Sequence, residues 1–579
     1  MGNPEFGNRG PGAQSGDGKA LQPTISSQSS RTTDASKNNQ LPTMATIADD
    51  DDRLLVRIGY APVLQRHFSR WSTVSYAISI LGVLGSVPAT FGAPMSSGGP
   101  ATAVWAWFIG SIMAYCIASS GIILQLISSP LKLTTPSLVA ELVSAYPTAG
   151  GMYYVTKHVV PPEHVAAWSW IIGWCNFLGQ AAGVASLAYT ISQMILATAV
   201  MHTLDGAGPT FEPKAYQTVL LAIFVLCMFG AICSFPTNWL HRIILWFAPI
   251  NIIASICICI ALLILTPNKQ SPKWVFTTVM DGSGWGSQGF SFLLGFLSVA
   301  WTMTDYDGTT HMSEETHDAA IRGPVAIRAA ILVSGVVGWM LTVTFCFCMS
   351  DYDAIMSTPT GLPVAQIFFN AGGKTGGTIM WFFVMLVQFF TGCSAMLANA
   401  RMAWAFARDA AFPFSDFWSK VNTHTHTPVN AVWLVVVFCS CLDLIGIGST
   451  LTITAIFNIT APALDISYIA VIIAHRWYEG RVVFHPGPYS MGKWSKPVNA
   501  IAVTWVIFIS VVLFFPTVRP VRVDNMNYAI CVAAFIGFFS TVWWYAGARK
   551  KYTGPRTSDT IDMLPPEDPE EIFNDYDSP

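Results

Sequence analysis

Charged side chains are scarce in this chain. Only 11% of its 579 residues are Asp, Glu, Lys or Arg, 52% are hydrophobic, and the formal net charge is −3. Soluble domains carry a charge on about a quarter of their residues. The composition therefore predicts a membrane protein whose main partner is the lipid bilayer, and the small net charge gives no reason to expect nucleic acid binding.

Motifs of enzymes and metal sites are missing as well. The sequence has no G-x-S-x-G, Walker or H-E-x-x-H pattern, so we expect neither an enzyme nor a cofactor. The twelve cysteines are scattered through apolar segments without metal-ligand spacing, which favours small buried hydrophobes over redox or metal chemistry. His424 and His426 share a loop without a third ligand, so no metal site is predicted there.

Two polar tails flank the apolar part of the chain. Residues 1–54 are rich in Ser, Asn and Gln, and residues 551–579 end in the acidic stretch LPPEDPEEIFNDYDSP. Such segments bury too little apolar surface to fold, so we expect two disordered tails around a membrane domain at 55–550. No apolar stretch follows Met1 closely enough for a cleavable signal peptide.

Apolar runs of about 20 residues recur between the tails, the length that a bilayer core requires of a helix. We expect about twelve spans, at roughly 72–98, 101–127, 165–200, 217–237, 241–266, 288–308, 324–349, 377–407, 429–446, 450–475, 497–516 and 526–547. The loops of one side hold about twenty Lys and Arg and the alternate loops about six, which places both termini in the cytoplasm. The plasma membrane or the vacuolar membrane fits this multi-pass pattern.

The first and sixth spans are interrupted. Gly82, Gly85 and Pro88 break the first, and the polar run AWTMTDYDGTT with Gly308 breaks the sixth. Gly and Pro also form simple kinks in membrane helices, so each break alone has an ordinary explanation. Unwound backbone in lipid is tolerated only where it lines a cavity, and matching breaks in two halves of a chain indicate the central site of a transporter.

Three motifs resemble a known family. ELVSAYPTAGGMYYVTKHVVPP (141–162), TMTDYDGTTHMSEET (302–316) and RMAWAFARDAAFPFSDFWSKVNTHTHTPVNA (401–431) resemble the fungal amino acid and choline permease branch of the amino acid, polyamine and organocation superfamily. The second motif is most similar to GABA permeases. The resemblance, over roughly residues 55–550, implies an all-α fold of two inverted five-helix repeats (70–266 and 286–475) with two peripheral helices (497–547). It also implies uptake driven by an ion gradient, usually of protons.

The two breaks predict where a substrate binds. Amides at the start of a half-helix favour an anion, so the first break would hold a carboxylate, while the sixth would offer carbonyls and Asp305 to an ammonium. Aromatic walls would surround a cationic head, although most aromatics in such helices only pack. The expected ligand is a small zwitterionic or cationic amino compound, bound by Gly82, Val83, Leu84, Gly85, Ser86, Tyr189, Trp301, Thr302, Thr304, Asp305, Tyr306 and Phe389.

Other acids are candidates for proton coupling and gating. Asp305 and Asp307 are expected to carry protons, unless they lie beyond the membrane edge and cap backbone groups. Glu141 and Asp465 lie in or near apolar spans, with Arg401 and Arg408 as partners in a cytoplasmic gate or a structural cluster. Glu314 and Glu315 are expected to pair with loop bases rather than with substrate.

The sequence therefore predicts a proton symporter that imports GABA or another amino acid. It leaves open a choline or polyamine permease of the same fold, a nutrient sensor without flux, and the oligomeric state, a monomer included.

The segment GIILQLISSPLKLTTPSL (121–138) departs from the family pattern. Pro130 and Pro136 break any helix through it, and without it YCIASSVAELVSAYPTAGG reads as one helix leading into a turn. A loop insertion is tolerated cheaply, but this segment begins inside a helix. Its 18 residues correspond to three times as many nucleotides, about the size of a short fungal intron in frame, so we expect a translated, unspliced intron.

Overall fold

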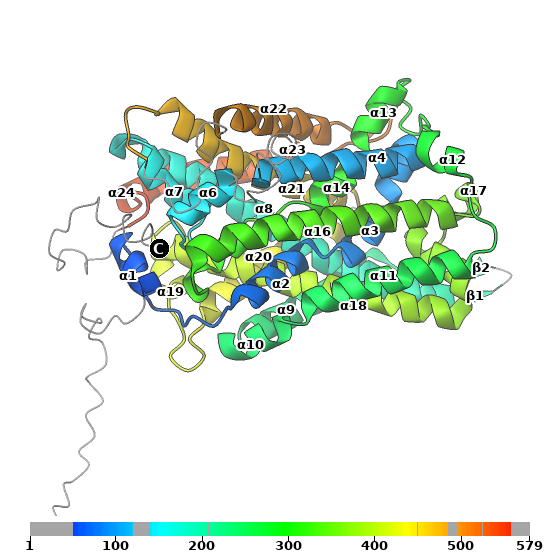
Figure 1. Cartoon of the computed structure of the whole chain (residues 1–579), viewed down its shortest axis with the longest axis horizontal. Coiled ribbons are helices and arrows are strands. Elements are labelled where there is room, and N and C mark those ends of the chain that lie inside the picture. Colours follow the sequence, from blue (N-terminus) through cyan, green and yellow to red (C-terminus); the bar gives the residue numbers. More distant parts are fainter. Residues whose placement is uncertain are drawn as a thin grey trace, which may run out of the picture. The chain divides into compact units, whose positions relative to one another are not determined.

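The computed structural model describes residues 50–119, 138–205, 208–447, 450–484, 495–523 and 525–556. These residues form one helical body, in which long helices run roughly side by side (Figure 1). The expected tails up to residue 49 and from 557 onward, and the unusual segment up to residue 137, lie outside the described residues. The predictions made for them therefore stay predictions.

Eleven helical segments of the described residues are long and apolar enough to cross a membrane. With the interrupted sixth span they account for the twelve predicted spans, so the all-α integral membrane fold is confirmed. Their helices are α2 (Arg70–Leu81) with α3 (Val83–Thr90), α4 (Gly92–Ser119), α8 (Pro162–His202), α9 (Ala215–Cys233), α10 (Thr237–Ile244) with α11 (Phe247–Leu265), α16 (Ala319–Cys348), α18 (Pro363–Arg408), α20 (Val429–Leu444), α21 (Thr450–Trp477), α22 (Ser495–Phe514) and α23 (Ala529–Trp543).

Shorter elements connect these helices. The two-residue strands β1 (Leu204–Asp205) and β2 (Gly208–Pro209) pair antiparallel in one turn. The remaining short helices are α1 (Asp50–Arg57), α6 (Leu138–Ala145), α7 (Met152–Val159), α12 (Pro272–Thr277), α17 (Tyr352–Met356), α19 (Ser415–Trp418), α24 (Arg549–Lys551), the 3₁₀ turn η3 (Ile445–Ile447) and the π turn η5 (Trp544–Ala548).

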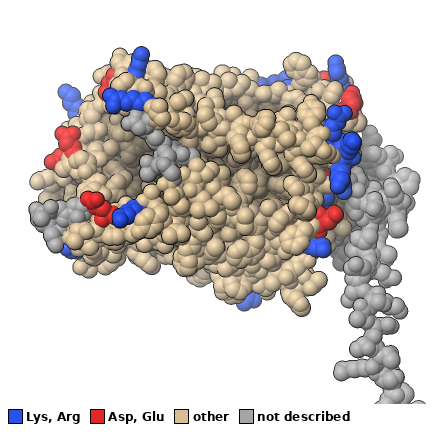
Figure 2. Space-filling model, turned by 180° about the vertical axis from the view of Figure 1, so that it is seen from behind, with Lys and Arg blue, Asp and Glu red and all other residues tan. Residues whose placement is uncertain are grey.

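The outer surface suits a bilayer. Phe224 on α9, Ile264 on α11 and Phe538 on α23 expose 60%, 75% and 68% of their surface. Apolar side chains exposed over such a wide area mark contact with lipid. Figure 2 shows the complementary pattern, because Lys, Arg, Asp and Glu gather at the two ends of the bundle and leave a broad uncharged band between them. We call the end that carries α1 and α24 the terminal end.

Both predicted breaks are present. Gly82 has a left-handed backbone (φ 40°) and separates α2 from α3. In the sixth span, α13 (Gln288–Leu294) and α14 (Leu297–Thr302) are followed by an unwound stretch, residues 303–307, and then by α15 (Gly308–His311) and the turn η2 (Ser313–Glu315). Within the unwound stretch Asp305 has φ 60°, a value that is uncommon outside glycine. α3 packs on both α14 and α18, so the two breaks share the middle of the bundle with α8 and α21.

Candidate functional site

A pocket lies between the two interrupted helices. It encloses about 340 Å³ of space that no atom fills, part of it open to solvent. We call it the central pocket. It is lined by Ile80 of α2, Ser86 of α3, Gly183 and Leu187 of α8, Trp301, Thr302, Thr304 and Asp305 of the sixth span, Thr391 and Ala395 of α18, and Thr460 of α21.

Several polar atoms of this pocket have no partner in the protein. The hydroxyls of Thr302 and Thr304 and the Oδ1 atom of Asp305 are buried and make no hydrogen bond. Buried polar groups are nearly always hydrogen-bonded, because leaving one unsatisfied costs about 1–3 kcal/mol. Three such atoms around one pocket indicate a site that a polar ligand completes.

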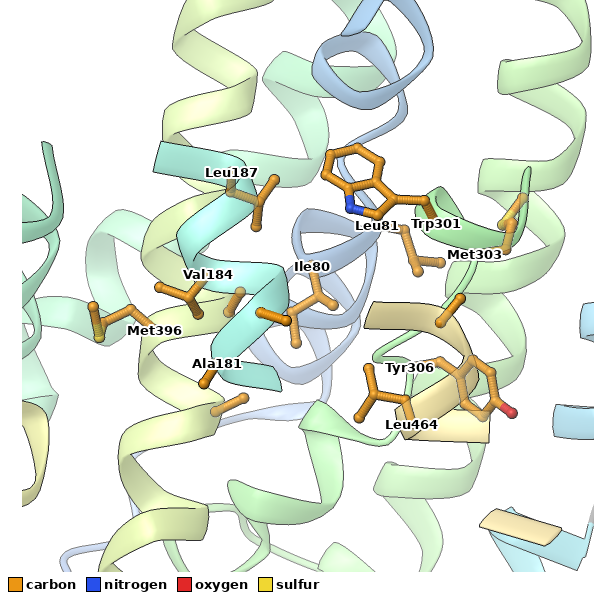
Figure 3. Packing of buried hydrophobic residues seen from close by; sticks show 14 of the residues in the cluster. Ile80, Leu81, Ala181, Val184, Leu187, Trp301, Met303, Tyr306, Met396 and Leu464 are labelled. Atoms are coloured by element: carbon orange, nitrogen blue, oxygen red, sulfur yellow. The ribbon is translucent and has the colours of Figure 1, made fainter. Parts of the chain in front are cut away.

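The opposite wall of the pocket is apolar. Figure 3 shows the indole of Trp301 extending toward Leu187, with Ile80 nearby. The ring is held on two sides, because its Nε1 donates to Ser186 Oγ at 3.1 Å and its face stacks on Phe457 with centroids 5.3 Å apart. This wall is therefore fixed in place, as a surface for the carbon skeleton of a ligand must be.

The predicted glycines bring the first break close to α18. A Cβ atom at Gly82 would lie 2.8 Å from the Cβ of Thr391, and one at Gly85 would lie 2.7 Å from the Cα of Gln388. Gly85, unlike Gly82, is helical, so its role is close packing and not a positive φ. The neighbouring Val83 and Leu84 are buried, and Leu84 N–H donates to Asn251 Oδ1 at 3.3 Å.

Seven of the twelve predicted binding residues do not line the central pocket, namely Gly82, Val83, Leu84, Gly85, Tyr189, Tyr306 and Phe389. Tyr189 is buried on α8 but does not line it. Phe389 packs against Phe229, with ring centroids 5.1 Å apart, and Tyr306 faces a different pocket. The lining residues that the sequence did not predict, among them Gly183 and Leu187, come from uninterrupted apolar helices. Only the hydroxyls of Thr391 and Thr460 offered any sequence signal.

Asp307 does not line the central pocket either. Its carboxylate is fully buried and accepts hydrogen bonds from the hydroxyl of Tyr468 on α21 and from Asn176 Nδ2 on α8, the latter at 2.9 Å. His311 Nε2 lies 3.6 Å away. The two hydrogen bonds tie the unwound stretch to α21 and α8.

An ionic cluster lies between η2 and α18 at the terminal end. Arg401 Nε donates to Glu315 Oε1 at 2.8 Å, and Arg408 NH2 donates to Glu314 Oε1 at 3.0 Å. Both glutamates pair with bases, as expected, but these bases lie on α18 and not in a loop. The expected partnership of Arg401 with Asp465 is wrong, because the chain turns back at η2 and presents the glutamates to α18. The side chain of Glu141 lies outside the described residues.

Both described ends of the chain reach the same carboxylate next to this cluster. Asp409, which follows α18, accepts hydrogen bonds from the hydroxyl of Tyr60 at 3.0 Å, the hydroxyl of Tyr153 at 2.9 Å and the backbone N–H of Arg556 at 3.1 Å. Burial raises the pKa of the Asp409 carboxyl, while the adjacent Arg408 guanidinium opposes that rise. We call this arrangement the Asp409 junction.

Comparison with known proteins agrees with this geometry. Residues 68–538 match a family described as amino acid permease. An uncharacterised amino-acid permease of Schizosaccharomyces pombe is 44% identical over 518 residues, 89% of this chain and 91% of that protein. Amino-acid permease 2 of Neurospora crassa is 36% identical over 88% of this chain and 90% of its own length. Amino-acid permease BAT1 of Arabidopsis thaliana is 31% identical over 88% and 97%.

Proposed function

The chain belongs to the amino acid permease family, and on that premise we propose that it is a proton symporter that imports a small amino acid. Transport of amino acids is the general activity of this family. The further proposals here are the coupling ion, the direction, the binding residues and the preference among amino acids.

The unpartnered polar atoms of the central pocket are the observation that supports this proposal best. Asp305 Oδ1 supplies a negative charge to a substrate ammonium, and the hydroxyls of Thr302 and Thr304 are free to hydrogen-bond the same ligand. Ser86, in the first turn of α3, lies where the helix dipole favours an anion and receives the substrate carboxylate. A zwitterion satisfies both ends of the site.

The preference for GABA rests on the TMTDYD motif. Asp305 lines the pocket, whereas Glu314 and Glu315 of the same motif bind arginines and do not reach it. A separate amine and carboxylate match GABA or another small amino acid better than choline, which has no carboxylate, or a polyamine, which has no anionic group for the start of α3.

The ionic cluster acts as a gate in this proposal. The terminal end faces the cytoplasm, and the pairs of Arg401 with Glu315 and of Arg408 with Glu314 close that side while substrate enters from the other. Alternating access then requires the pairs to separate. The protein works in the plasma membrane or the vacuolar membrane, and the site needs residues of only one chain.

Uptake into proteoliposomes tests the proposal. Purified protein is reconstituted with an alkaline interior and offered labelled GABA, proline, basic amino acids, choline and spermidine in turn. We expect accumulation of an amino acid above equilibrium, abolished by a protonophore. Saturable binding without net flux of any of these compounds would instead identify a nutrient sensor.

The variant Asp305→Asn tests the binding site. Loss of a charged hydrogen bond costs about 2 kcal/mol, which corresponds to an increase of about 30-fold in the KM for substrate. Asp353→Asn removes the same charge from the exposed helix α17 and is the matched control. Unchanged KM in Asp305→Asn would place the amine elsewhere.

A further inference from the structure

A second pocket lies on the other side of the unwound stretch of the sixth span. We call it the side pocket. It is lined by Gly110, Ala114 and Ile117 of α4, Phe296, Val299, Ala300, Met303 and Tyr306 of the sixth span, Asp465 of α21, and Trp505 and Ile509 of α22. Asp465 is its one acidic lining residue, and the other lining side chains apart from Tyr306 are apolar.

The unwound stretch is the common wall of the two pockets. Thr304 and Asp305 line the central pocket, whereas Met303 and Tyr306 line the side pocket. Figure 3 shows this division, because Met303 and Tyr306 extend away from the side on which Trp301 and Leu187 meet. A movement of this stretch in one pocket therefore also changes the wall of the other pocket.

Asp465 has no partner among the described residues. Its side chain is 8% exposed, and no hydrogen bond or ion pair of the described part of the chain involves it. An ionised carboxylate without a partner at membrane depth is costly, whereas a carboxylic acid that gains and loses a proton is a recognised functional element there.

The charged and titratable groups around Asp465 are few. The sixth span contributes Tyr306, whose hydroxyl makes no hydrogen bond, and the fully buried Asp307, which follows Tyr306 in the sequence. α21 itself contributes Tyr468, whose hydroxyl is committed to Asp307. The residues that α4 and α22 contribute to the side pocket are not titratable.

The three neighbouring acids have three different surroundings. Asp305 faces the central pocket and is placed to bind substrate, and Asp307 is held by fixed donors. Asp465 alone faces a pocket outside the substrate site with its carboxyl uncommitted. No group of three or more His, Cys, Asp or Glu residues that could hold a metal ion occurs among the described residues, whereas one carboxyl group is sufficient to hold a proton.

We propose that Asp465 is the residue that carries the coupled proton, in the side pocket and apart from the substrate. This inference rests on the proposed symport. When the side pocket faces the acidic side, the carboxylate takes a proton from hydronium and leaves water; on the alkaline side the carboxylic acid returns the proton to water. Neutral and ionised Asp465 interact differently with Tyr306, and the unwound stretch transmits the difference to Asp305.

The test compares exchange with accumulation in proteoliposomes. In Asp465→Asn we expect substrate counterflow to stay within about threefold of the unmodified protein, while accumulation driven by a pH gradient falls to the equilibrium level. Substrate affinity should also stop varying with pH. Asp443→Asn is the matched control, because Asp443 is a fully buried aspartate of α20 that lines neither pocket. It should accumulate substrate normally.

Two conservative variants distinguish loss of the proton site from misfolding of Asp465→Asn. Asp465→Glu keeps a carboxyl on a longer side chain, so accumulation should persist with its pH profile shifted. Tyr306→Phe removes only the phenol hydroxyl and should also shift that profile. Proton-driven accumulation in Asp465→Asn, or an unchanged pH profile in Asp465→Glu, would overturn the inference. The proposed symport would then still stand, whereas it fails only if the unmodified protein does not accumulate substrate in response to a pH gradient.

Discussion

A methyl group at Gly85 would lie 2.7 Å from the Cα of Gln388, a backbone atom that cannot move aside as a side chain can. The break in the first span thus depends on two glycines for different reasons. Gly82 provides the left-handed turn, and Gly85 lets α3 approach α18. The sequence predicted the break, but it did not distinguish these two roles.

The first prediction concerns this contact. Gly85→Val should separate α3 from α18, at a cost of about 1–3 kcal/mol for overpacking, and should lower substrate binding by tenfold or more because Ser86 moves with the helix. Binding of labelled substrate to detergent-purified protein measures the effect. Gly537→Val is the control, since a Cβ atom at Gly537 of α23 meets no atom within 4 Å. Normal affinity in Gly85→Val would remove the first break from the binding site.

The pocket-lining residues that could be predicted are those next to a break. Ser86, Thr302, Thr304 and Asp305 were recognisable because polar groups and glycines interrupt apolar runs there, and all four line the central pocket. Leu187 was not recognisable, because an apolar side chain that faces a pocket looks the same in sequence as one that faces lipid.

At the scale of elements, the apolar runs located the spans well but not their ends. The eighth span was expected at 377–407, whereas α18 runs from Pro363 to Arg408. The reason is local, because NAGGKTGG (370–377) has no helical pattern and Gly373 kinks the helix with φ 64°. The long α18 is therefore two helices that meet at the Gly373 kink, and the second of them corresponds to the expected span.

The second prediction concerns the segment 121–138, which begins two residues beyond the end of α4 at Ser119. α4 and α6 pack against each other, and α6 starts at Leu138, the last residue of the segment. We expect the transcript to lack the segment in part or in full, and the shortened chain to transport at least as fast as the full one. Sequencing of the transcript and parallel uptake assays measure both. If every transcript keeps the segment and its deletion destroys transport, it is a genuine structural element.

At the scale of the whole molecule, the proposed gate consists of contacts between distant parts of the sequence. Arg401 and Glu315 are 86 residues apart and are 0% and 1% exposed. The acids and bases were visible in the sequence, but their pairing was not, because it depends on how η2 turns back toward α18. Removing one partner of a buried ion pair costs about 3–5 kcal/mol. Loss of either residue should therefore destabilise the closed state strongly.

The third prediction tests how strongly the Arg401–Glu315 pair stabilises the closed state. Glu315→Gln leaves the Arg401 guanidinium without its carboxylate, so the closed terminal end should open more often. Hydrogen exchange of the amides in residues 308–318 should accelerate by about tenfold or more. Glu479→Gln is the control, since Glu479 is 44% exposed where it meets Arg476 and Lys496, and exposed pairs contribute about 0–1 kcal/mol. Equal exchange rates in the two variants would show that the buried pair does not hold the gate.

The Asp409 junction has a practical consequence for handling this protein. Tyr60 from the first described segment and Arg556 from the last bind one carboxylate, and the neighbouring Tyr552 is 1% exposed and donates to Ser169 Oγ at 3.0 Å. The segments around Tyr60 and Arg556 are therefore not independent attachment sites. An affinity tag or fluorescent protein inserted next to Tyr60 or Arg556 would disturb the hydrogen bonds of Asp409. A pair of dyes attached near these two residues would report whether the Asp409 junction separates during transport.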